Sequence, residues 1–372
     1  MKETLLPPIW VDDIKGLNKL VSILNKQLIL AIDTESNGLH AYQEQVCLVQ
    51  VSTKDADYLI DPMALEDLEP LAEIFLDPKI EKVFHAAEYD LICLKRDFDI
   101  EVANLFDTRW AVRILGYKGD GLDRLLGEKF GVKVNKKYQK ANWAVRPLSD
   151  EQTNYARMDT HYLIPLRNML KDELEARGLW QLAHEDFLRA CQVEIPNGRP
   201  ALWERVGSQN GFTLRELTIL KELGECRERI AERLDRPVFK VVSDKQLFEI
   251  AKLVPEDPND LLGAGLSPRQ VKRWGYDFLR AVERGKELPL VKRPQIERPS
   301  DAFLSRLDTL KKWRKKAAQK MGVESDVVLP RNLMELLARK RPNTLPQLED
   351  VLSVSPWRMA RFGSQMLQIL KG

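Results

Sequence analysis

Long apolar runs are missing from this sequence of 372 residues. The longest apolar stretches, such as residues 28–32, are far too short to cross a bilayer, which takes about 20 residues in a helix. The N-terminus starts Met-Lys-Glu-Thr and soon reaches two prolines, so it lacks the apolar segment of a secretory signal. We therefore expect a protein that has no contact with membranes and is cytoplasmic.

Cysteine is scarce, and a nucleotide-binding loop is absent. The four cysteines, Cys47, Cys93, Cys191 and Cys226, show no C-x-x-C spacing. This disfavours a disulfide framework and a zinc site, and it favours buried thiols in a reducing compartment. No G-x-x-x-x-G-K-[ST] segment occurs, which excludes a helicase driven by ATP.

Excess charge of either sign is also missing from the whole chain, whose net charge is +2. Residues 1–200 nevertheless carry 25 Lys and Arg against 33 Asp and Glu, whereas residues 301–372 carry 14 against 7. An acidic part can hold cations and a basic part can attract phosphate, although a fluctuation in surface charge would give the same numbers. The length predicts two or three domains.

The first half of the chain alternates short β-rich stretches with helical ones. Strands are expected at 28–32, 46–51, 58–60 and 82–84, and the first three have the spacing of an antiparallel meander. The expected helices are 14–24, 65–75, 86–96, 108–115, 122–130 and a long one from Ser149, its cap, to about Arg177.

Helical periodicity dominates after a segment rich in proline and glycine at 195–200, and a second break at 287–299 contains three prolines. The helical blocks on either side of this break look related. Ala231 and Ala317 match at an offset of 86, Leu261 and Leu348 at 87, and Gly275 and Gly363 at 88. We predict an α/β domain at 1–198, a first helical domain at 207–286, a linker at 287–300 and a second helical domain at 301–372.

Two acidic residues directly follow an apolar stretch, in Leu-Ala-Ile-Asp33-Thr-Glu35. Side chains two apart on a strand point to the same face, so both carboxylates project together. Two like charges on one face are unfavourable unless a cation neutralises them, and oxygen ligands suit hard ions such as Mg²⁺. The pair therefore predicts a divalent-metal site.

Three more candidates lie in segments expected to be helical. Tyr155 and Asp159 are four apart and share one helical face, and Asp90 interrupts an otherwise apolar run. Each alone is weak evidence, because such residues are usually caps, packed aromatics or solvated charges. Their order and the elements that carry them favour one shared site. We leave His85 and His161 out of the metal set, because a structural histidine explains each as well.

This series, Asp-x-Glu, a later Asp and then Tyr-x-x-x-Asp, resembles the DEDD exonucleases of the tyrosine subtype. The segments at 45–52, 106–108 and 142–149 are similar to the ribonuclease D family, and the two helical blocks resemble its HRDC domains. The resemblance covers nearly the whole chain. It implies a ribonuclease H-like α/β domain with a mixed sheet, followed by two all-α HRDC-like bundles. Ser36 departs from it, because many ribonuclease D sequences have an aromatic residue there.

The resemblance also implies roles. Asp33, Glu35, Asp90 and Asp159 would hold two divalent cations, Mg²⁺ or Mn²⁺, and Tyr155 would orient the attacking water. We assign Tyr155 positioning and not proton removal, because a phenol with a pKa near 10 is a poor base at neutral pH. The implied reaction removes 5′-mononucleotides from the 3′ end of RNA, in tRNA 3′ processing and turnover of structured RNA. We expect a monomer without an obligate protein partner.

The most basic segment lies at 311–320, where positions 312, 316 and 320 share one helical face. Such a face can bind a phosphate backbone, whereas the alternative is a solvated surface above Trp313, which we expect in the core. Two further alternatives stay open, a DNA exonuclease and a nucleic-acid-binding adaptor with an inactive nuclease domain. The candidate nucleic-acid-binding residues are Lys311, Lys312, Lys315, Lys316 and Lys320.

Overall fold

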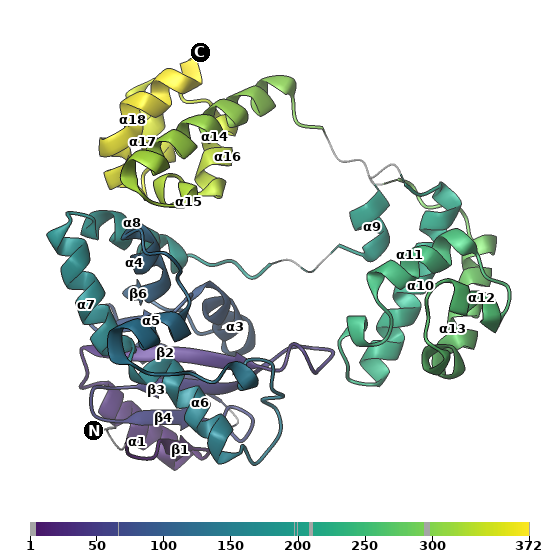
Figure 1. Ribbon diagram of the computed structural model, residues 1–372, viewed down its shortest axis with the longest axis horizontal. Helices are drawn as coiled ribbons and strands as arrows, with labels where there is room; N and C mark the ends of the chain where they lie inside the picture. The colour runs from purple at the N-terminus through teal and green to yellow at the C-terminus, as the bar shows by residue number, and fades with distance from the viewer. Residues whose placement is uncertain are drawn as a thin grey trace. The chain divides into compact units, whose positions relative to one another are not determined.

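A computed structural model describes the chain except residues 1–4, 66, 197, 199, 208–210, 294–297 and 372. It divides into two compact units (Figure 1). The first contains Met1–Ser36, Val46–Ile195 and Pro299–Gly372, and the second contains Asn37–Gln45 and Pro196–Arg298. Residues 294–297 of the predicted linker lie outside the described residues. None of the helices described is long and apolar enough for a membrane span.

The α/β domain contains one mixed sheet, as predicted. β2, β3 and β4 form the expected antiparallel meander. β5 and β6 join β2 in parallel on one side, and β1 joins β4 in parallel on the other. The strand order is β1-β4-β3-β2-β5-β6. The strands are β1 (Ile9–Val11), β2 (Ile29–Ser36), β3 (Val46–Ser52), β4 (Asp57–Ile60), β5 (Glu81–Phe84) and β6 (Leu105–Asp107).

Helices cover this sheet, and every residue of β3 is buried. α6 contacts β2, β3 and β4, and α7 contacts β2 and β5. α6 begins with the predicted cap, in which Ser149 and Gln152 bond to each other's backbone N–H. The helices of the domain are α1 (Ile14–Leu24), α2 (Glu69–Leu76), α3 (Glu88–Phe98), α4 (Thr108–Ile114), α5 (Leu122–Phe130), the short η1 (Lys136–Tyr138), α6 (Asp150–His161), α7 (Leu163–Ala176) and α8 (Trp180–Ala190).

The single long helix predicted from Ser149 to about Arg177 is wrong. The chain leaves helical geometry at Tyr162, which ends α6 and precedes α7. Pro165 gives the physical reason, because its ring would clash with the carbonyl of His161 and it has no N–H to donate to it. Both helices contact β2, and the break lets α6 extend over β3 and β4 and α7 over β5.

The two helical domains repeat one arrangement. In the first, Gly275 lies against Leu261, and in the second, Gly363 lies against Leu348, which are the pairs matched in the sequence. A long opening helix, α10 or α14, contacts the closing helix, α13 or α18. The first domain contains α10 (Leu214–Arg233), η2 (Val238–Lys240), α11 (Asp244–Leu253), α12 (Pro258–Gly263) and α13 (Pro268–Glu287), preceded by α9 (Leu202–Gly207). The second contains α14 (Asp301–Met321), α15 (Ser325–Val328), α16 (Arg331–Lys340), α17 (Leu345–Val351) and α18 (Pro356–Lys371).

The second helical domain belongs to the same unit as the α/β domain and packs on α8. Arg358 of α18 is fully buried at this contact. Its guanidinium donates to Glu185 at 3.0 Å and to Asp186 at 2.8 Å, both on α8. It also donates to the carbonyls of Val327 and Val328, so one side chain joins α8, α15 and α18.

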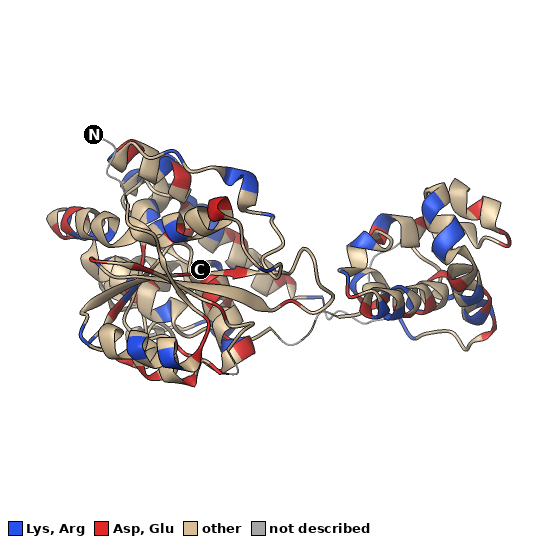
Figure 2. Ribbon diagram, turned by 90° about the horizontal axis from the view of Figure 1, so that it is seen from below, with Lys and Arg blue, Asp and Glu red and all other residues tan. Residues whose placement is uncertain are grey.

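Both units carry charge of both signs, as Figure 2 shows. Basic residues stand beside acidic ones in each unit, and several pairs are ion pairs, such as Arg167 with Glu81 and Arg227 with Asp244. The acidic balance of residues 1–200 therefore does not make a uniformly negative surface. Among the residues described, one group of carboxylates close enough to share a cation is found, around Asp33 and Glu35.

Candidate active site

Asp33 and Glu35 lie on β2, which is paired with β3 through Asp33↔Gln50 and Glu35↔Leu48. Their alternation along the strand places both carboxylates on one face, as predicted. The register shifts between Glu35 and Ser36, so regular pairing stops where the acidic pair ends. The strand thus presents two carboxylates side by side at the edge of a cavity.

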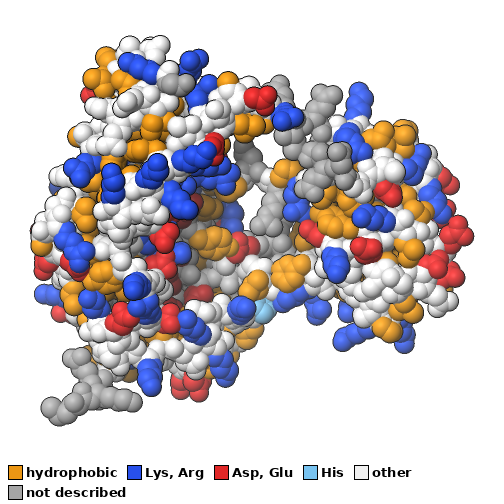
Figure 3. All heavy atoms as spheres, turned by 45° about the horizontal axis from the view of Figure 1, so that its top comes forward, with side chains coloured by type: hydrophobic (Ala, Val, Ile, Leu, Met, Phe, Trp, Pro, Cys, Tyr) orange, Lys and Arg blue, Asp and Glu red, His pale blue; other side chains and the backbone are white. Residues whose placement is uncertain are grey.

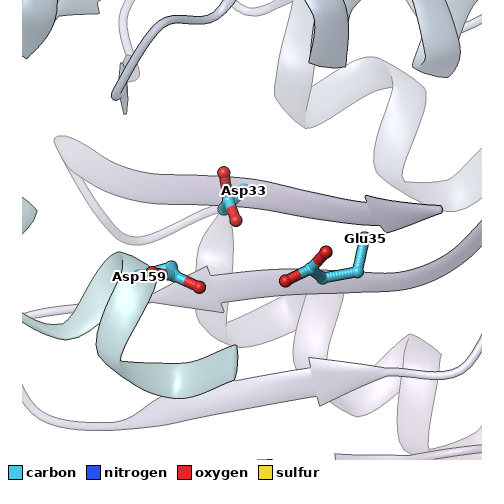
Figure 4. A group of neighbouring side chains, drawn as sticks. All are labelled: Asp33, Glu35 and Asp159. Carbon is cyan, nitrogen blue, oxygen red and sulfur yellow. The ribbon is translucent and has the colours of Figure 1, made fainter. Parts of the chain in front are cut away.

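Asp159 is brought to this pair by α6. One carboxylate oxygen from each of Asp33, Glu35 and Asp159 lies within 4.8 Å of the others. Figure 4 shows the three carboxylates turned toward a common space, two from the strand and one from the helix. Tyr155, one turn earlier on α6, lines the same cavity. Segments far apart in the sequence therefore meet as expected.

Asp90 stands next to these three but is held differently. It lies in the first turn of α3 and is buried. Its Oδ1 accepts hydrogen bonds from the backbone N–H of Thr34 at 3.1 Å and from the Thr34 hydroxyl at 2.5 Å. Because Thr34 separates Asp33 from Glu35, the fourth carboxylate is tied to the strand that carries the first two.

Burial and mutual repulsion both act on these acids. Burial, followed by the charge of Asp90, raises the pKa of Asp33 well above its ordinary value. Burial also raises the pKa of Glu35, with a further contribution from Asp159. The pKa of Asp90 rises to about 7 and that of Asp159 to about 8, again mainly through burial. Burial and repulsion thus make the ionised form of these carboxylates unfavourable, and a bound cation would stabilise that form.

The donor set fits divalent metal ions. Every donor in the cluster is a carboxylate oxygen, the type that Mg²⁺ and Mn²⁺ prefer, and no cysteine is near enough to favour a soft metal among the residues described. Asp33, Glu35, Asp90 and Asp159 would hold the cations. Four carboxylates carry the charge that balances two such ions.

Metal binding is expected to release protons. At pH 7 and without a metal, Asp159 is mostly protonated and Asp90 is about half protonated, given pKa values of about 8 and about 7. A cation binds the ionised form, so affinity for Mn²⁺ should rise as pH increases from 6 to 8, by up to about tenfold per pH unit for each proton released. Titration calorimetry in two buffers with different heats of ionisation measures this release. Equal heats in the two buffers would contradict it.

Tyr155 combines an apolar surrounding with an acidic neighbour. It packs with Trp143 and Tyr138, whose rings lie 6.0 and 6.1 Å from its own. Burial, and then the charge of Asp159, raises its pKa above the ordinary value of 10. The phenol is therefore neutral at physiological pH. It can donate a hydrogen bond but cannot serve as a base there.

The cavity that contains these residues has a volume of about 450 Å³. Sequence reasoning missed most of its other walls, because they come from the turn after β5, from α4, α5 and η1, and from the loops between them. His85 was considered, and the Phe-Asp-Thr segment at 106–108 was noted beside it. The further lining residues are His85, Ala86, Arg109, Asp120, Gly121, Leu122, Asp123, Val134, Lys136 and Gln139.

Asp107, within that segment, fixes the turn after β5. Its carboxylate accepts from the backbone N–H groups of Ala86 at 3.1 Å and Ala87 at 2.9 Å. Ala86 has a φ of 68°, a left-handed conformation that is unfavourable for alanine and persists only when its surroundings hold it. The same carboxylate also caps α4. Asp107 thereby joins the His85 turn and the start of α4 beside the cavity.

His161 and the basic segment lie outside the lining of the cavity, whereas His85 lines it without belonging to the group of close carboxylates. His85 lines the cavity and contacts the Thr108 hydroxyl at 3.0 Å, whereas His161 faces Asp57 at 2.9 Å. Trp313 packs against Phe362 in the second helical domain but is only partly buried, so it lies at the margin of the core in which we expected it. Lys and Arg side chains gather on the face of the first unit seen in Figure 3. The five predicted lysines are all exposed on α14, outside the lining of the catalytic cavity: Lys311, Lys312, Lys315, Lys316 and Lys320.

Known proteins are similar to this chain in sequence. Exosome complex exonuclease RRP6 of Saccharomyces cerevisiae is 34% identical over 273 residues, which cover 69% of this chain and 37% of that protein. Protein RRP6-like 1 of Arabidopsis thaliana is 38% identical over 264 residues, covering 66% of this chain and 41% of that one. The chain spans less than half the length of the curated relatives it matches.

Solved structures share the fold. The crystal structure of Escherichia coli RNase D, an exoribonuclease involved in structured RNA processing, has a TM-score of 0.72 at 24% identity, covering 98% of this chain and 99% of that one. Residues 8–175 match the 3′-5′ exonuclease family, and residues 216–282 and 303–370 each match the HRDC domain. The internal repeat is therefore a pair of HRDC domains. The chain thus combines a domain of the 3′-5′ exonuclease family at residues 8–175 with two HRDC domains.

Proposed function

We propose that this chain is an exoribonuclease that removes 5′-mononucleotides one at a time from the 3′ end of RNA, using two divalent cations. The observation that carries the proposal is the cluster of Asp33, Glu35 and Asp159 within 4.8 Å, with Asp90 tied to the same strand. The family match and the names of the relatives support the direction and the substrate.

The chain's residues then divide the work. When bound, the cations would provide a nucleophilic water at neutral pH and neutralise the charge that develops on the phosphate. Asp33, Glu35, Asp90 and Asp159 hold them, and the tie between Asp90 and Thr34 fixes one ligand against the strand. The neutral Tyr155 hydroxyl orients the attacking water by hydrogen bonding.

Structured RNA and the 3′ ends of tRNA precursors are the proposed substrates. RNase D of E. coli is described as acting in structured RNA processing, and its fold extends over nearly all of this chain. The alternatives are the same chemistry on DNA 3′ ends and a binding adaptor without activity. That the protein is a cytoplasmic monomer without an obligate protein partner stays a prediction.

One experiment tests direction and reaction together. RNA labelled at its 5′ end, incubated with the protein and Mg²⁺ or Mn²⁺, should give a ladder that shortens from the 3′ end, with 5′-mononucleotides released. A matched DNA oligomer separates the sugar preference. RNA that stays intact with both metals would contradict the proposal. The alternative of a nucleic-acid-binding adaptor without activity would then be favoured.

Tyr155→Phe should lower turnover by about 10²-fold while metal affinity is kept, because it removes one positioned hydroxyl and no metal ligand. Initial rates and calorimetric metal titration measure the two effects. Tyr162→Phe, a change of the same size on the neighbouring turn outside the cavity lining, is the control. Equal rates for Tyr155→Phe and the control would refute the positioning role.

The lysines of α14 are proposed to bind the RNA backbone away from the 3′ end. Reversing Lys312, Lys316 and Lys320 to glutamate should weaken RNA binding and reduce its salt dependence, by about 0.7 log unit of affinity per log unit of salt for each phosphate of a single strand that is no longer neutralised. Anisotropy of labelled RNA across a salt series measures both. Reversal of three exposed lysines of the α/β domain, Lys15, Lys19 and Lys26, controls for total charge, and an equal loss of affinity there would remove the role of α14.

A further inference from the structure

Two basic side chains line the catalytic cavity, and each is already paired with an aspartate of the same cavity. Arg109 Nε lies 2.8 Å from Asp120 Oδ2, and Lys136 Nζ lies 2.8 Å from Asp123 Oδ2. All four side chains are partly exposed, so solvent and ligands reach them. Arg109 comes from α4 and Lys136 from η1.

The cavity requires these positive charges once RNA enters. Two divalent cations balance the four carboxylates and leave nothing to balance the phosphates of the substrate. Burial lowers the pKa of His85, so this histidine is neutral at pH 7 and adds no charge. Among the described residues that line the cavity, Arg109 and Lys136 are the remaining basic side chains.

The aspartates compete with phosphate for the same groups. The hydrogen bond from Arg109 lowers the pKa of Asp120, and the one from Lys136 lowers that of Asp123. Asp120 and Asp123 are therefore ionised at neutral pH, and they pair with Arg109 and Lys136 in the absence of RNA. Arginine binds phosphate and carboxylate with the same N–H groups, so only one of the two anions can hold its best geometry.

We propose that Arg109 and Lys136 bind backbone phosphates of the RNA 3′ end, and that Asp120 and Asp123 hold them until RNA exchanges carboxylate for phosphate. This inference rests on the proposed exoribonuclease function. It assigns Arg109 and Lys136 as the groups that bind the substrate. It also assigns Asp120 and Asp123 as competitors that lower the affinity for RNA. Weak retention of the shortened strand suits an enzyme that must move its substrate after every cleavage.

Arg113 is a second possible partner for Asp120 once Arg109 binds phosphate. Arg113 Nε lies 4.0 Å from the same Asp120 oxygen, and Arg113 Nη2 is 2.5 Å from Asp326 of α15. Arg109, Arg113 and Asp120 also line a depression of about 530 Å³, and Arg109 and Asp120 line the catalytic cavity as well. The released aspartate is thus not left without a cation, which favours the exchange.

The depression also shows where the upstream strand would lie. Besides the two arginines it contains Lys118, and its far wall is the turn at 322–324 that follows α14. Gly116 allows this close approach, because a Cβ there would lie 2.6 Å from the Gly322 carbonyl oxygen. Phosphates upstream of the 3′ end would therefore pass Arg109 and Lys118 toward the second HRDC domain.

The test is a double-mutant cycle on Arg109 and Asp120. Asp120→Asn should lower the KM for single-stranded RNA by about two- to fivefold with kcat unchanged, the range expected for a partly exposed pair. Arg109→Gln should raise KM by about tenfold, because a charged hydrogen bond to phosphate is lost. In the Arg109→Gln background, Asp120→Asn should bring no gain. Glu128→Gln, which breaks an exposed pair with Arg124 on α5 outside both cavities, is the control.

The cycle separates exchange from general repulsion. If removing a negative charge merely made the cavity less repulsive, the gain from Asp120→Asn would persist without Arg109, and this result would overturn the proposal. A KM of Asp120→Asn equal to that of Glu128→Gln would also overturn the proposal. Thermal unfolding of each variant identifies folding defects, and Asp123→Asn offers an independent second pair with Lys136. A wild-type protein that leaves RNA intact would instead overturn the exoribonuclease function itself.

Discussion

Asp33→Asn should lower RNA hydrolysis by about 10³-fold or more. The substitution keeps the shape of the side chain and removes one charge from the group of oxygens within 4.8 Å. A metal ion contributes several kcal/mol to a phosphoryl transition state, and every 1.4 kcal/mol changes the rate about tenfold. Rates measured at saturating Mn²⁺, together with calorimetric metal affinity, would show whether binding or chemistry is impaired.

Asp33→Asn is expected to have the opposite effect on stability, because it should stabilise the metal-free protein. The pKa of Asp33 is raised in the folded state, so between its unfolded value near 4 and its folded value the native protein binds more protons than the unfolded chain. Stability without metal therefore falls as pH rises through this window, and Asn removes that decrease. At pH 8 and without metal, Asp33→Asn should unfold at a higher temperature than wild type.

Asp172→Asn is the matched control, because Asp172 is exposed on α7 and lies outside the cavity. It should change neither the rate nor the unfolding temperature. A variant of Asp33 that is slow and also less stable than the control would indicate a damaged fold, and one with wild-type rate would remove Asp33 from the metal site.

Arg358→Ala is expected to lower the free energy of unfolding of the first unit by about 3–5 kcal/mol, the usual cost of leaving buried charges without their partner. Arg358 has no exposed surface, and Glu185 and Asp186, its partners on α8, are also buried. Burial already raises the pKa of Glu185 despite the arginine beside it. Without Arg358, Glu185 keeps the Trp357 N–H and Asp186 keeps Arg189, but each loses one donor, as do the carbonyls of Val327 and Val328.

Denaturant unfolding measures this destabilisation, and limited proteolysis near residue 300 reports release of the second HRDC domain. Arg361→Ala, an exposed arginine on the same helix, should leave both unchanged. Combining Arg358→Met with Glu185→Gln should recover part of the stability, because Asp186 then keeps Arg189 as its partner and the charge of Glu185 is gone. Identical unfolding midpoints for Arg358→Ala and Arg361→Ala would show that the buried arginine is not needed.

The chemistry of the site could be predicted where it depends on local periodicity. The alternation along β2 sets Asp33 beside Glu35, and one helical turn sets Tyr155 beside Asp159. The bounds of α1 and α5 were also evident, because Leu17, Leu20 and Leu24 recur at helical spacing and Gly131 ends α5. The paired HRDC domains followed from matched positions that turned out to be a glycine against a leucine in both.

Other features depend on contacts between distant segments and left no local pattern. β1 and β6 have three residues each, too few to show alternation, and they exist because longer strands offer them an edge. The break at Tyr162 was missed because helical periodicity continues across Pro165. Arg109 and Lys136 resemble ordinary surface charges until α4 and η1 meet around the cavity.

The bond between Thr34 and Asp90 has a consequence for how the site is assembled. Three consecutive residues of β2 supply two of the carboxylates and the anchor of Asp90, so these three carboxylates depend on the sheet and on α3. α6 comes from a later part of the chain, and it brings Asp159 and Tyr155 together. Local detachment of α6 would thus remove Asp159 and Tyr155 from the site at the same time and leave the other three carboxylates in place.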